Sequence, residues 1–221
     1  MGSSVSIHPK KNDNLNENKI SYSPSDSATD TSSLNDDTKK IDEYIGEKCL
    51  DGKPEGTGIM YYANGSIYEG SWHAGKQHGK GKYKYSRGSV YEGSFFDGRQ
   101  NGFGSCLYAN QDTYEGEWRV GLRHGKGKYC YYSTGDIYEG EYICDIAEGD
   151  GKYIFFNGDI YEGKYKKGNR HGHGKYTYKC GDIYEGEFFV NKFDGMGKFT
   201  YASGDWYEGI YRKYYYYLYF S

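Results

Sequence analysis

The stretch YEGEWRVGLRHGKGKY, Tyr114 to Tyr129, decides the fold of this chain. From Tyr114 to Trp118 the aromatic residues and a glycine alternate with two glutamates, and from Gly125 to Tyr129 glycine and tyrosine alternate with lysine. A period of two residues is typical of a β-strand, because successive side chains of a strand point to opposite faces. The stretch therefore predicts two short strands, each with an aromatic-and-glycine face and a charged face.

The same pattern recurs at a nearly constant interval. Tyr-Glu-Gly begins, in steps of 23 or 24 residues, at Tyr68, Tyr91, Tyr114, Tyr138, Tyr161, Tyr184 and Tyr207. A degenerate copy, Tyr44-Ile45-Gly46, precedes them, and Gly-x-Gly follows each of the first six tyrosines by 11 residues. A fixed period of this length indicates stacked repeats. We therefore predict an all-β fold, an elongated single-layer antiparallel meander of about fourteen to sixteen strands with two open edges.

Two kinds of turn are expected between the strands. Asn64-Gly65 is typical of a hairpin turn, and the extra residue of the one 24-residue step is predicted to lie in the corresponding turn, residues 131–135. The other turn carries one equivalent position, occupied by Gly75, Gly98, Gly121, Asp145, Gly168 and Asn191. Because these residue types tolerate left-handed backbone, a positive φ is predicted there.

Glycines on the aromatic face have a separate explanation. A glycine leaves a flat gap that a neighbouring aromatic ring covers. Gly116, Gly125 and Gly127 are therefore predicted to form a floor under aromatic rings. Glutamates and lysines on the other face are predicted to pair across strands.

Composition argues against several classes of protein. The chain has 34 Gly and 29 Tyr but six Leu, so an ordinary aliphatic core is not expected. Its net charge of −3 gives no electrostatic case for nucleic-acid binding. No apolar run of about 18 residues is present to span a membrane, and no secretory signal follows Met1. Five cysteines without a CxxC pair favour free thiols in a reducing compartment.

The composition also divides the chain into three segments. Residues 1–40 are rich in Ser, Asn, Asp and Lys and are predicted to be a disordered tail. Residues 41–213 form the predicted repeat array. Residues 214–221 are mostly tyrosine and break the repeat, and we expect them to pack as a final strand, a short helix or a docking segment for another subunit.

The repeated consensus Y-E-G-x-aromatic-x-x-G-x-x-x-G-x-G-x-Y resembles the MORN (membrane occupation and recognition nexus) repeat over residues 44–211. Asp145 and Asn191 replace the usual glycine, and residues 98–106 lack the usual His-Gly and the tyrosine after Gly-x-Gly. The resemblance implies about seven two-stranded repeats in a non-enzymatic scaffold, a homodimerising rod or a groove that holds a partner's tail segment. Direct phospholipid binding is also proposed for that family.

The aromatic face is the predicted partner-binding surface, since aromatic grooves suit the capture of a helix or an extended peptide. Its candidate contact residues are Tyr68, Trp72, Tyr91, Phe95, Tyr114, Trp118, Tyr138, Tyr142, Tyr161, Tyr165, Tyr184 and Phe188. The expected occupant is a protein partner segment or a second copy of the chain. Two alternatives stay open, direct recognition of anionic phospholipid by the lysine-bearing face and a role as regulatory subunit of a separate enzyme.

The first residues, Met1-Gly2-Ser3-Ser4-Val5-Ser6, fit the N-myristoylation pattern, which makes Gly2 the predicted lipidation site. Myristate would place the protein on the cytosolic face of a membrane, either the plasma membrane or a pellicle-like cortical membrane. One acyl chain gives only reversible binding, so a partner or dimerisation would have to add to it.

No catalytic residue, metal site or cofactor is predicted. His78, His124 and His171 share one repeat position and so lie too far apart for a common metal ion. The Gly-x-Gly pairs do not stand between a strand and a helix, as a phosphate-binding loop requires.

Overall fold

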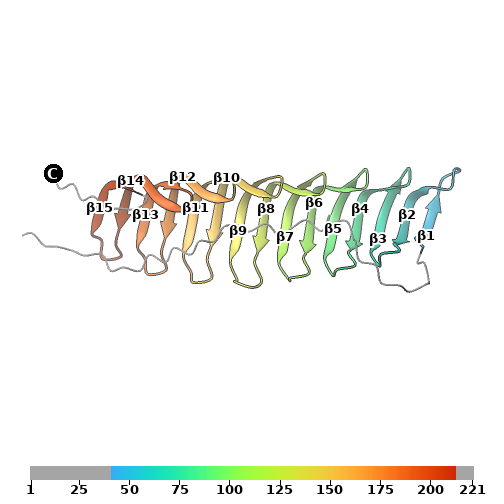
Figure 1. The fold of residues 1–221 in the computed structure, drawn as a ribbon, viewed down its shortest axis with the longest axis horizontal. Helices are drawn as coiled ribbons and strands as arrows, with labels where there is room; N and C mark the ends of the chain where they lie inside the picture. The colour runs from blue at the N-terminus through green and yellow to red at the C-terminus, as the bar shows by residue number, and fades with distance from the viewer. Residues whose placement is uncertain (1–40, 213–221) are drawn as a thin grey trace, which may run out of the picture.

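The computed structural model describes residues 41–212, which form fifteen β-strands and no helix (Figure 1). In chain order the strands are β1 (Glu43–Lys48), β2 (Pro54–Tyr61), β3 (Ile67–His73), β4 (Lys76–Lys84), β5 (Val90–Phe96), β6 (Arg99–Leu107), β7 (Thr113–Arg119), β8 (Leu122–Cys130), β9 (Ile137–Ile143), β10 (Ile146–Ile154), β11 (Ile160–Lys166), β12 (Asn169–Thr177), β13 (Ile183–Phe189), β14 (Lys192–Thr200) and β15 (Trp206–Tyr211). The tail of residues 1–40 and the aromatic residues 214–221 lie outside the described residues, so the predictions about them stay predictions.

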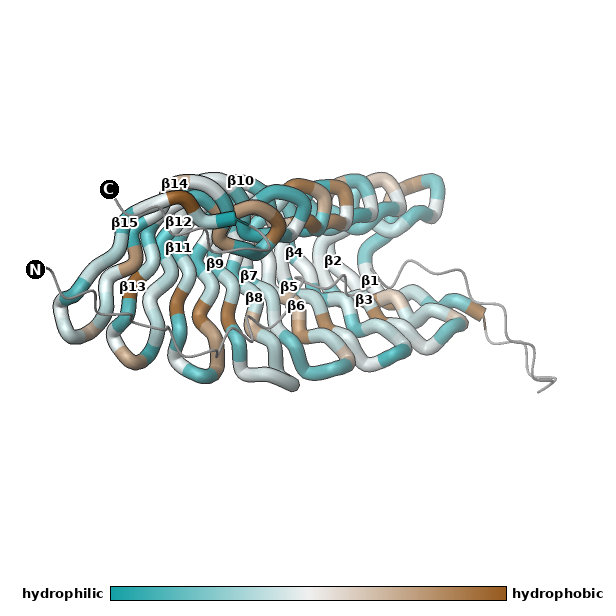
Figure 2. Tube along the Cα trace, turned by 60° about the vertical axis from the view of Figure 1, so that its left-hand side comes forward, coloured by the Kyte–Doolittle hydropathy of each residue, from teal (hydrophilic) through white to brown (hydrophobic). Residues whose placement is uncertain are grey.

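All fifteen strands belong to one antiparallel sheet in which the spatial order is the sequence order. Among the described strands, β1 and β15 each have a single neighbour and form the two edges. The predicted all-β meander of stacked two-stranded repeats is thereby confirmed. Figure 2 shows that the strands curve, so the sheet is bent along the strand direction rather than flat.

The register brings equivalent residues of successive strands together. Tyr114 lies opposite Tyr129 and Gly116 lies opposite Gly127, and the corresponding pairs recur through the sheet. Aromatic residues and glycines therefore line one face, and the Glu and Lys residues line the other, as the alternation predicted. The five cysteines are free, in agreement with the sequence.

The turns also follow the sequence. Gly121, Asp145 and Asn191 have φ values of 83°, 68° and 68°, which confirms the predicted left-handed position. The residue before each is left-handed too, for example Val120 at 53°. Two consecutive positive φ values define the hairpin turn that matches strand twist. In the 24-residue step, the turn that begins at Tyr131 closes one residue later than its equivalents, again as predicted.

One glycine prediction was wrong. Gly125 has a φ of 64° and lies at a β-bulge, where the register of β7 and β8 shifts between Gly116 and Trp118. The side chain that lies beside Gly125 is the Glu117 carboxylate, which accepts a hydrogen bond from the Lys126 N–H at 2.9 Å. Gly125 is therefore required for its backbone conformation, and it is not a floor for a ring.

No helix in the described part of the chain is long and apolar enough to cross a membrane.

Candidate functional site

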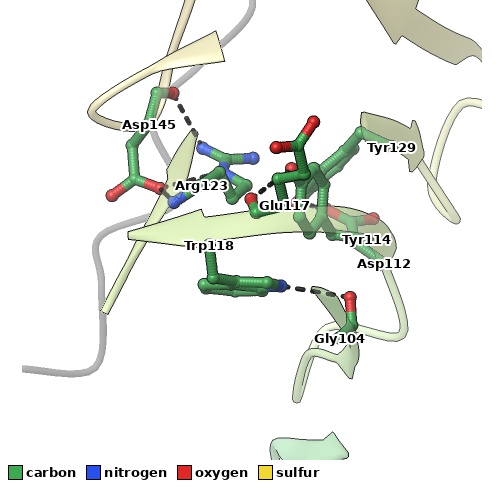
Figure 3. Close-up of polar contacts among 8 residues, drawn as sticks. All are labelled: Gly104, Asp112, Tyr114, Glu117, Trp118, Arg123, Tyr129 and Asp145. Carbon is green, nitrogen blue, oxygen red and sulfur yellow. Dashed lines mark hydrogen bonds and ion pairs between the residues drawn. The ribbon is translucent and has the colours of Figure 1, made fainter. Parts of the chain in front are cut away.

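The tyrosine of each Tyr-Glu-Gly motif lies flat across the glycines of its own repeat. The Tyr114 hydroxyl donates to the Glu117 carbonyl oxygen at 2.9 Å (Figure 3). The Tyr114 ring therefore spans Gly116. A methyl group added at Gly116 would lie 2.5 Å from the Cα of Gly127 and 2.6 Å from the Tyr114 hydroxyl. The floor predicted at Gly116 and Gly127 is thus present, and only glycine fits there.

These rings continue from repeat to repeat as a ladder of edge-to-face contacts. Tyr114 meets Trp118 of its own repeat at 5.1 Å and 87° between planes, and Trp118 meets Tyr91 of the preceding repeat at 5.1 Å and 84°. Trp118 also donates from Nε1 to the Gly104 carbonyl oxygen at 3.1 Å. Aromatic pairs of this geometry are each worth about 0.5–1.5 kcal/mol beyond the area they bury. The ladder is therefore the core of this single-layer protein.

All twelve residues predicted to contact a partner belong to this ladder. Tyr68, Trp72, Tyr91, Phe95, Tyr114, Trp118, Tyr138, Tyr142, Tyr161, Tyr165, Tyr184 and Phe188 are 0–7% exposed. These rings cover one another and the glycines, so they form no open surface in the described sheet. Their contact with a partner stays a prediction, and their burial leaves little surface for it.

A buried arginine joins two repeats beside the ladder. Arg123 is 3% exposed, and its guanidinium lies 5.1 Å from the ring centres of both Tyr129 and Tyr142. Its Nε donates to the Asp145 carboxylate at 3.0 Å, and its Nη2 donates to the Asp145 carbonyl oxygen at 3.0 Å (Figure 3). The guanidinium is therefore paired with a carboxylate and stacked on two aromatic rings. Both interactions offset the cost of removing its charge from water.

Arg170 occupies the same repeat position but has a poorer environment. It is 5% exposed and stacks near the rings of Phe155 and Tyr176, at 5.7 and 5.5 Å. Asn191 stands where Arg123 has Asp145, so the Arg170 Nη2 donates only to a carbonyl oxygen there. Its Nη1 is buried without a hydrogen-bond partner in the described structure.

Buried aspartates form a second link between repeats. Asp136, 4% exposed, accepts hydrogen bonds at 2.8 Å from the Tyr153 hydroxyl and from the N–H of Phe156 in the next turn. Asp112 and Asp159 make the same two kinds of contact, each about one repeat along the chain. Sequence reasoning missed both the aspartates and the arginines. The signal was present, since Gly-Asp-Ile precedes the Tyr-Glu-Gly motifs that begin at Tyr138, Tyr161 and Tyr184. Arg123 also shares the aromatic face by alternation.

A second row of rings on the same face remains partly accessible. We call it the aromatic stripe, and its half-buried members, one per repeat, are Tyr62, Tyr85, Tyr108, Tyr131, Phe155 and Tyr178. Tyr131 lies 4.5 Å from Tyr129 and 6.1 Å from Tyr153, so the stripe is braced against the core. Burial, reinforced by Tyr83, raises the pKa of Tyr62 to about 12, so its hydroxyl is neutral at ordinary pH.

The opposite face carries alternating charges. Glu139 lies between Lys128 and Lys152 on the neighbouring strands, and the Lys152 ammonium bridges to Glu162 at 3.0 Å. This confirms the predicted pairing of glutamate with lysine. The described residues contain no group of three His, Cys, Asp or Glu side chains able to hold a metal ion. The described sheet therefore presents two different surfaces, one aromatic and one charged.

Comparison with known proteins identifies the repeats. The family model described as the MORN repeat matches residues 44–67, 68–90, 91–113, 114–135, 138–160, 161–182 and 184–206. Among curated proteins, none matches this chain significantly.

Two solved structures from Drosophila melanogaster are similar. One is the SAS-4 TCP domain in complex with a proline-rich motif of Ana2, at 12% identity and a TM-score of 0.47, covering 81% of this chain and 97% of that chain. The other is the TCP10c domain of Sas-4, at 17% identity and a TM-score of 0.39, covering 70% of this chain and 85% of that chain. At these TM-scores neither structure bears on the function of this chain.

Proposed function

Because the chain belongs to the MORN-repeat family, we propose that it is a non-enzymatic scaffold that holds a protein partner segment, or a second copy of itself, against its aromatic face. The aromatic stripe is the observation that supports this proposal. Its rings are half-buried and recur once per repeat, so they offer a line of preorganised contacts. Rigid aromatic side chains give large contact area at low entropic cost, which makes them frequent hot spots.

The position of the stripe argues for an elongated occupant. Adjacent strands lie about 4.8 Å apart, so successive stripe rings are separated by two strands, or about 9.6 Å. A segment that follows the long axis of the rod meets one ring after another. The buried core rings beneath hold each stripe ring in place, as Tyr129 does for Tyr131.

The test is affinity capture of partners from cells with the full chain. The variant Tyr108→Ser/Tyr131→Ser removes two stripe rings, while the matched control Phe103→Ser removes a 55% exposed ring from the charged face. We expect the stripe variant to lose its specific partners and the control to keep them. Retention of all partners by a stripe variant that is folded by circular dichroism would refute the proposal.

Membrane tethering is a further part of the proposal. Myristate on Gly2 would hold the scaffold on the cytosolic face of the plasma membrane or of a pellicle-like cortical membrane. A single acyl chain binds with a constant on the order of 10⁴ M⁻¹, so the bound partner supplies the second attachment. Gly2→Ala is expected to move the protein from the membrane fraction to the cytosol. An unchanged distribution would remove the anchor from the account and leave the scaffold intact.

Direct binding of anionic phospholipid is a second candidate function. It is favoured by β4, whose charged face carries Lys76, Lys80, Lys82 and Lys84. Two of these lysines are already paired, Lys76 with Asp97 and Lys82 with Glu92. Non-myristoylated protein should then sediment with phosphatidylserine vesicles and be released by salt. No sedimentation at low salt would exclude this candidate.

A role as regulatory subunit of a separate enzyme differs from the first proposal only in the partner.

A further inference from the structure

Three apolar side chains are exposed together on the charged face at the C-terminal end of the sheet. Met196 and Ile210 are cross-strand partners and are each 55% exposed, and Trp206, on the same face of β15, is 61% exposed. We call these three residues the end patch. Lys198, which lies between them on β14, places its ammonium 4.7 Å from the centre of the Trp206 ring.

Two of the three residues of the end patch, Ile210 and Met196, depart from the repeat, whereas the positions equivalent to Trp206 are mostly Ile or Val. The positions equivalent to Ile210 are all polar, namely Ser71, Ser94, Glu117, Glu141, Lys164 and Glu187. Those equivalent to Met196 are polar with one exception, namely Lys80, Phe103, Lys126, Asp150 and His173. At these two positions the last repeat therefore has apolar side chains where most other repeats have polar ones, and it does so where the described sheet ends. Exposed apolar side chains gathered at one end of a sheet mark a candidate contact site. Here the charged pair Lys198 and Glu208 lies between Trp206 and the other two residues.

The end patch also adjoins an open sheet edge. Among the described strands β15 pairs only with β14, so no other described strand lies along its outer side. Proteins generally cover or blunt such an edge, because it pairs readily with other chains. One segment packed at this end of the sheet would cover both the outer side of β15 and the apolar residues of the end patch.

The nearest candidate for that segment is the chain that follows. The described residues end at Arg212, two residues after Ile210, and Lys213–Ser221 come next. Seven of these nine residues are aromatic or leucine, Tyr214 to Phe220. At about 3.3 Å per residue those seven reach about 23 Å, several times the spacing of about 4.8 Å between strands. Length and apolar character therefore suit the end patch.

The repeat pattern argues against a regular sixteenth strand. Tyr207 is equivalent to Tyr114, 93 positions earlier, so Leu218 falls at the place of Gly125 and Phe220 at the place of Gly127. Gly125 needs its φ of 64°, and a side chain at Gly127 would enter the space of the tyrosine ring. A strand with leucine and phenylalanine at these places cannot repeat the geometry of β8.

We propose that Tyr214–Phe220 fold back over the end patch of their own chain and cover Trp206, which closes the C-terminal end of the rod. The occupant is intramolecular, and a second copy of the chain is the competing occupant. This inference stands apart from the proposed partner binding, because it concerns the other face of the sheet.

Trp206 itself provides the test. The other two tryptophans, Trp72 and Trp118, are 5% and 7% exposed and occupy a position where other repeats carry Phe95 or Phe188. In a Trp72→Phe/Trp118→Phe background, Trp206 is the only tryptophan, and excitation at a wavelength that tyrosine does not absorb reports on it alone. Its fluorescence maximum and acrylamide quenching would be compared between the full chain and a chain that ends at Arg212.

We expect blue-shifted, poorly quenched emission from the full chain at every protein concentration, and a red shift with stronger quenching in the shortened chain. The full-length variant Tyr216→Ser/Leu218→Ser/Phe220→Ser should behave like the shortened chain. Identical spectra for full and shortened chains would overturn the proposal. Blue emission that disappears on dilution, together with a doubled mass by light scattering, would also overturn it and assign the patch to a second copy.

Discussion

Arg123 and Asp145 form an ion pair in which both side chains are shielded from solvent. The Nε–Oδ1 distance is 3.0 Å, and the side chains are 3% and 15% exposed, whereas the side chains of the other ion pairs in residues 41–212 are at least 38% exposed. Arg170 and Asn191 occupy the same two places one pair of repeats later, without a carboxylate. Two buried arginines at equivalent positions can therefore be compared, one that faces a carboxylate and one that does not.

Replacing Asp145 by Asn and Asn191 by Asp should change the free energy of unfolding in opposite directions. Asp145→Asn removes the carboxylate from Arg123 but keeps the left-handed turn, and we expect a loss of about 2 kcal/mol in the free energy of unfolding. Asn191→Asp gives Arg170 a carboxylate and should add about 1 kcal/mol, reduced by loss of its bond to the Asn169 side chain. Urea unfolding of the two variants measures both changes. A destabilising Asn191→Asp would contradict the interpretation.

The close approach of the glycines predicts a severe effect of one added methyl group. Gly116→Ala would place its Cβ 2.5 Å from the Cα of Gly127, which is backbone and cannot move aside. We expect a loss of at least about 3 kcal/mol, comparable with strong overpacking. Gly121→Asn is the control, because Asn191 occupies the equivalent left-handed position. Equal thermal stability of Gly116→Ala and the wild type would refute the packing of Tyr114 on this floor.

The turn between β7 and β8 contains a residue that is poorly suited to it. Val120 is β-branched and has a φ of 53°, a conformation that costs an L-residue about 1–2 kcal/mol. Val120→Asn creates the Asn-Gly sequence preferred by this turn, and we expect a gain of about 1 kcal/mol. Thermal unfolding would show a raised midpoint. A lowered midpoint would mean that the Val120 side chain makes a compensating contact.

Stability should fall in alkaline solution. Burial raises the pKa of Tyr62 to about 12 and also raises the pKa of Tyr68, Tyr91 and Tyr114 above the ordinary value of 10.0. The folded state then holds protons that the unfolded state releases, so stability is complete below pH 10 and decreases as the pH rises towards 12 and beyond. Tyrosinate absorbance and circular dichroism, followed together, should change in one cooperative step. Gradual ionisation of all tyrosines without loss of structure would contradict the buried ladder.

Much of the fold was predictable because the repeat encodes it locally. Alternation gave the strands, and the interchange of Gly121, Asp145 and Asn191 revealed a left-handed turn. The bulge at Gly125 was missed because alternation assumes a regular ladder and says nothing about an inserted residue. The glycine there was consequently assigned to the ring floor.

The candidate site was harder to predict. The twelve core rings were correctly placed on one face, but their burial depends on Tyr91 and Trp118 meeting across repeats, which a single strand does not show. The role of Arg123 was missed because its carboxylate partner, Asp145, stands 22 residues away in the sequence. The partly exposed aromatic stripe emerged only when the depth of each ring was known.

The most direct test of partner binding is photo-crosslinking from one position on each face. A photoreactive phenylalanine analogue would replace Phe155, a half-buried member of the aromatic stripe, or Phe103, which is 55% exposed on the charged face. The account predicts that the probe at position 155 forms an adduct with a protein partner or a second copy, and that the probe at position 103 does not. Adducts from position 103 alone would contradict it.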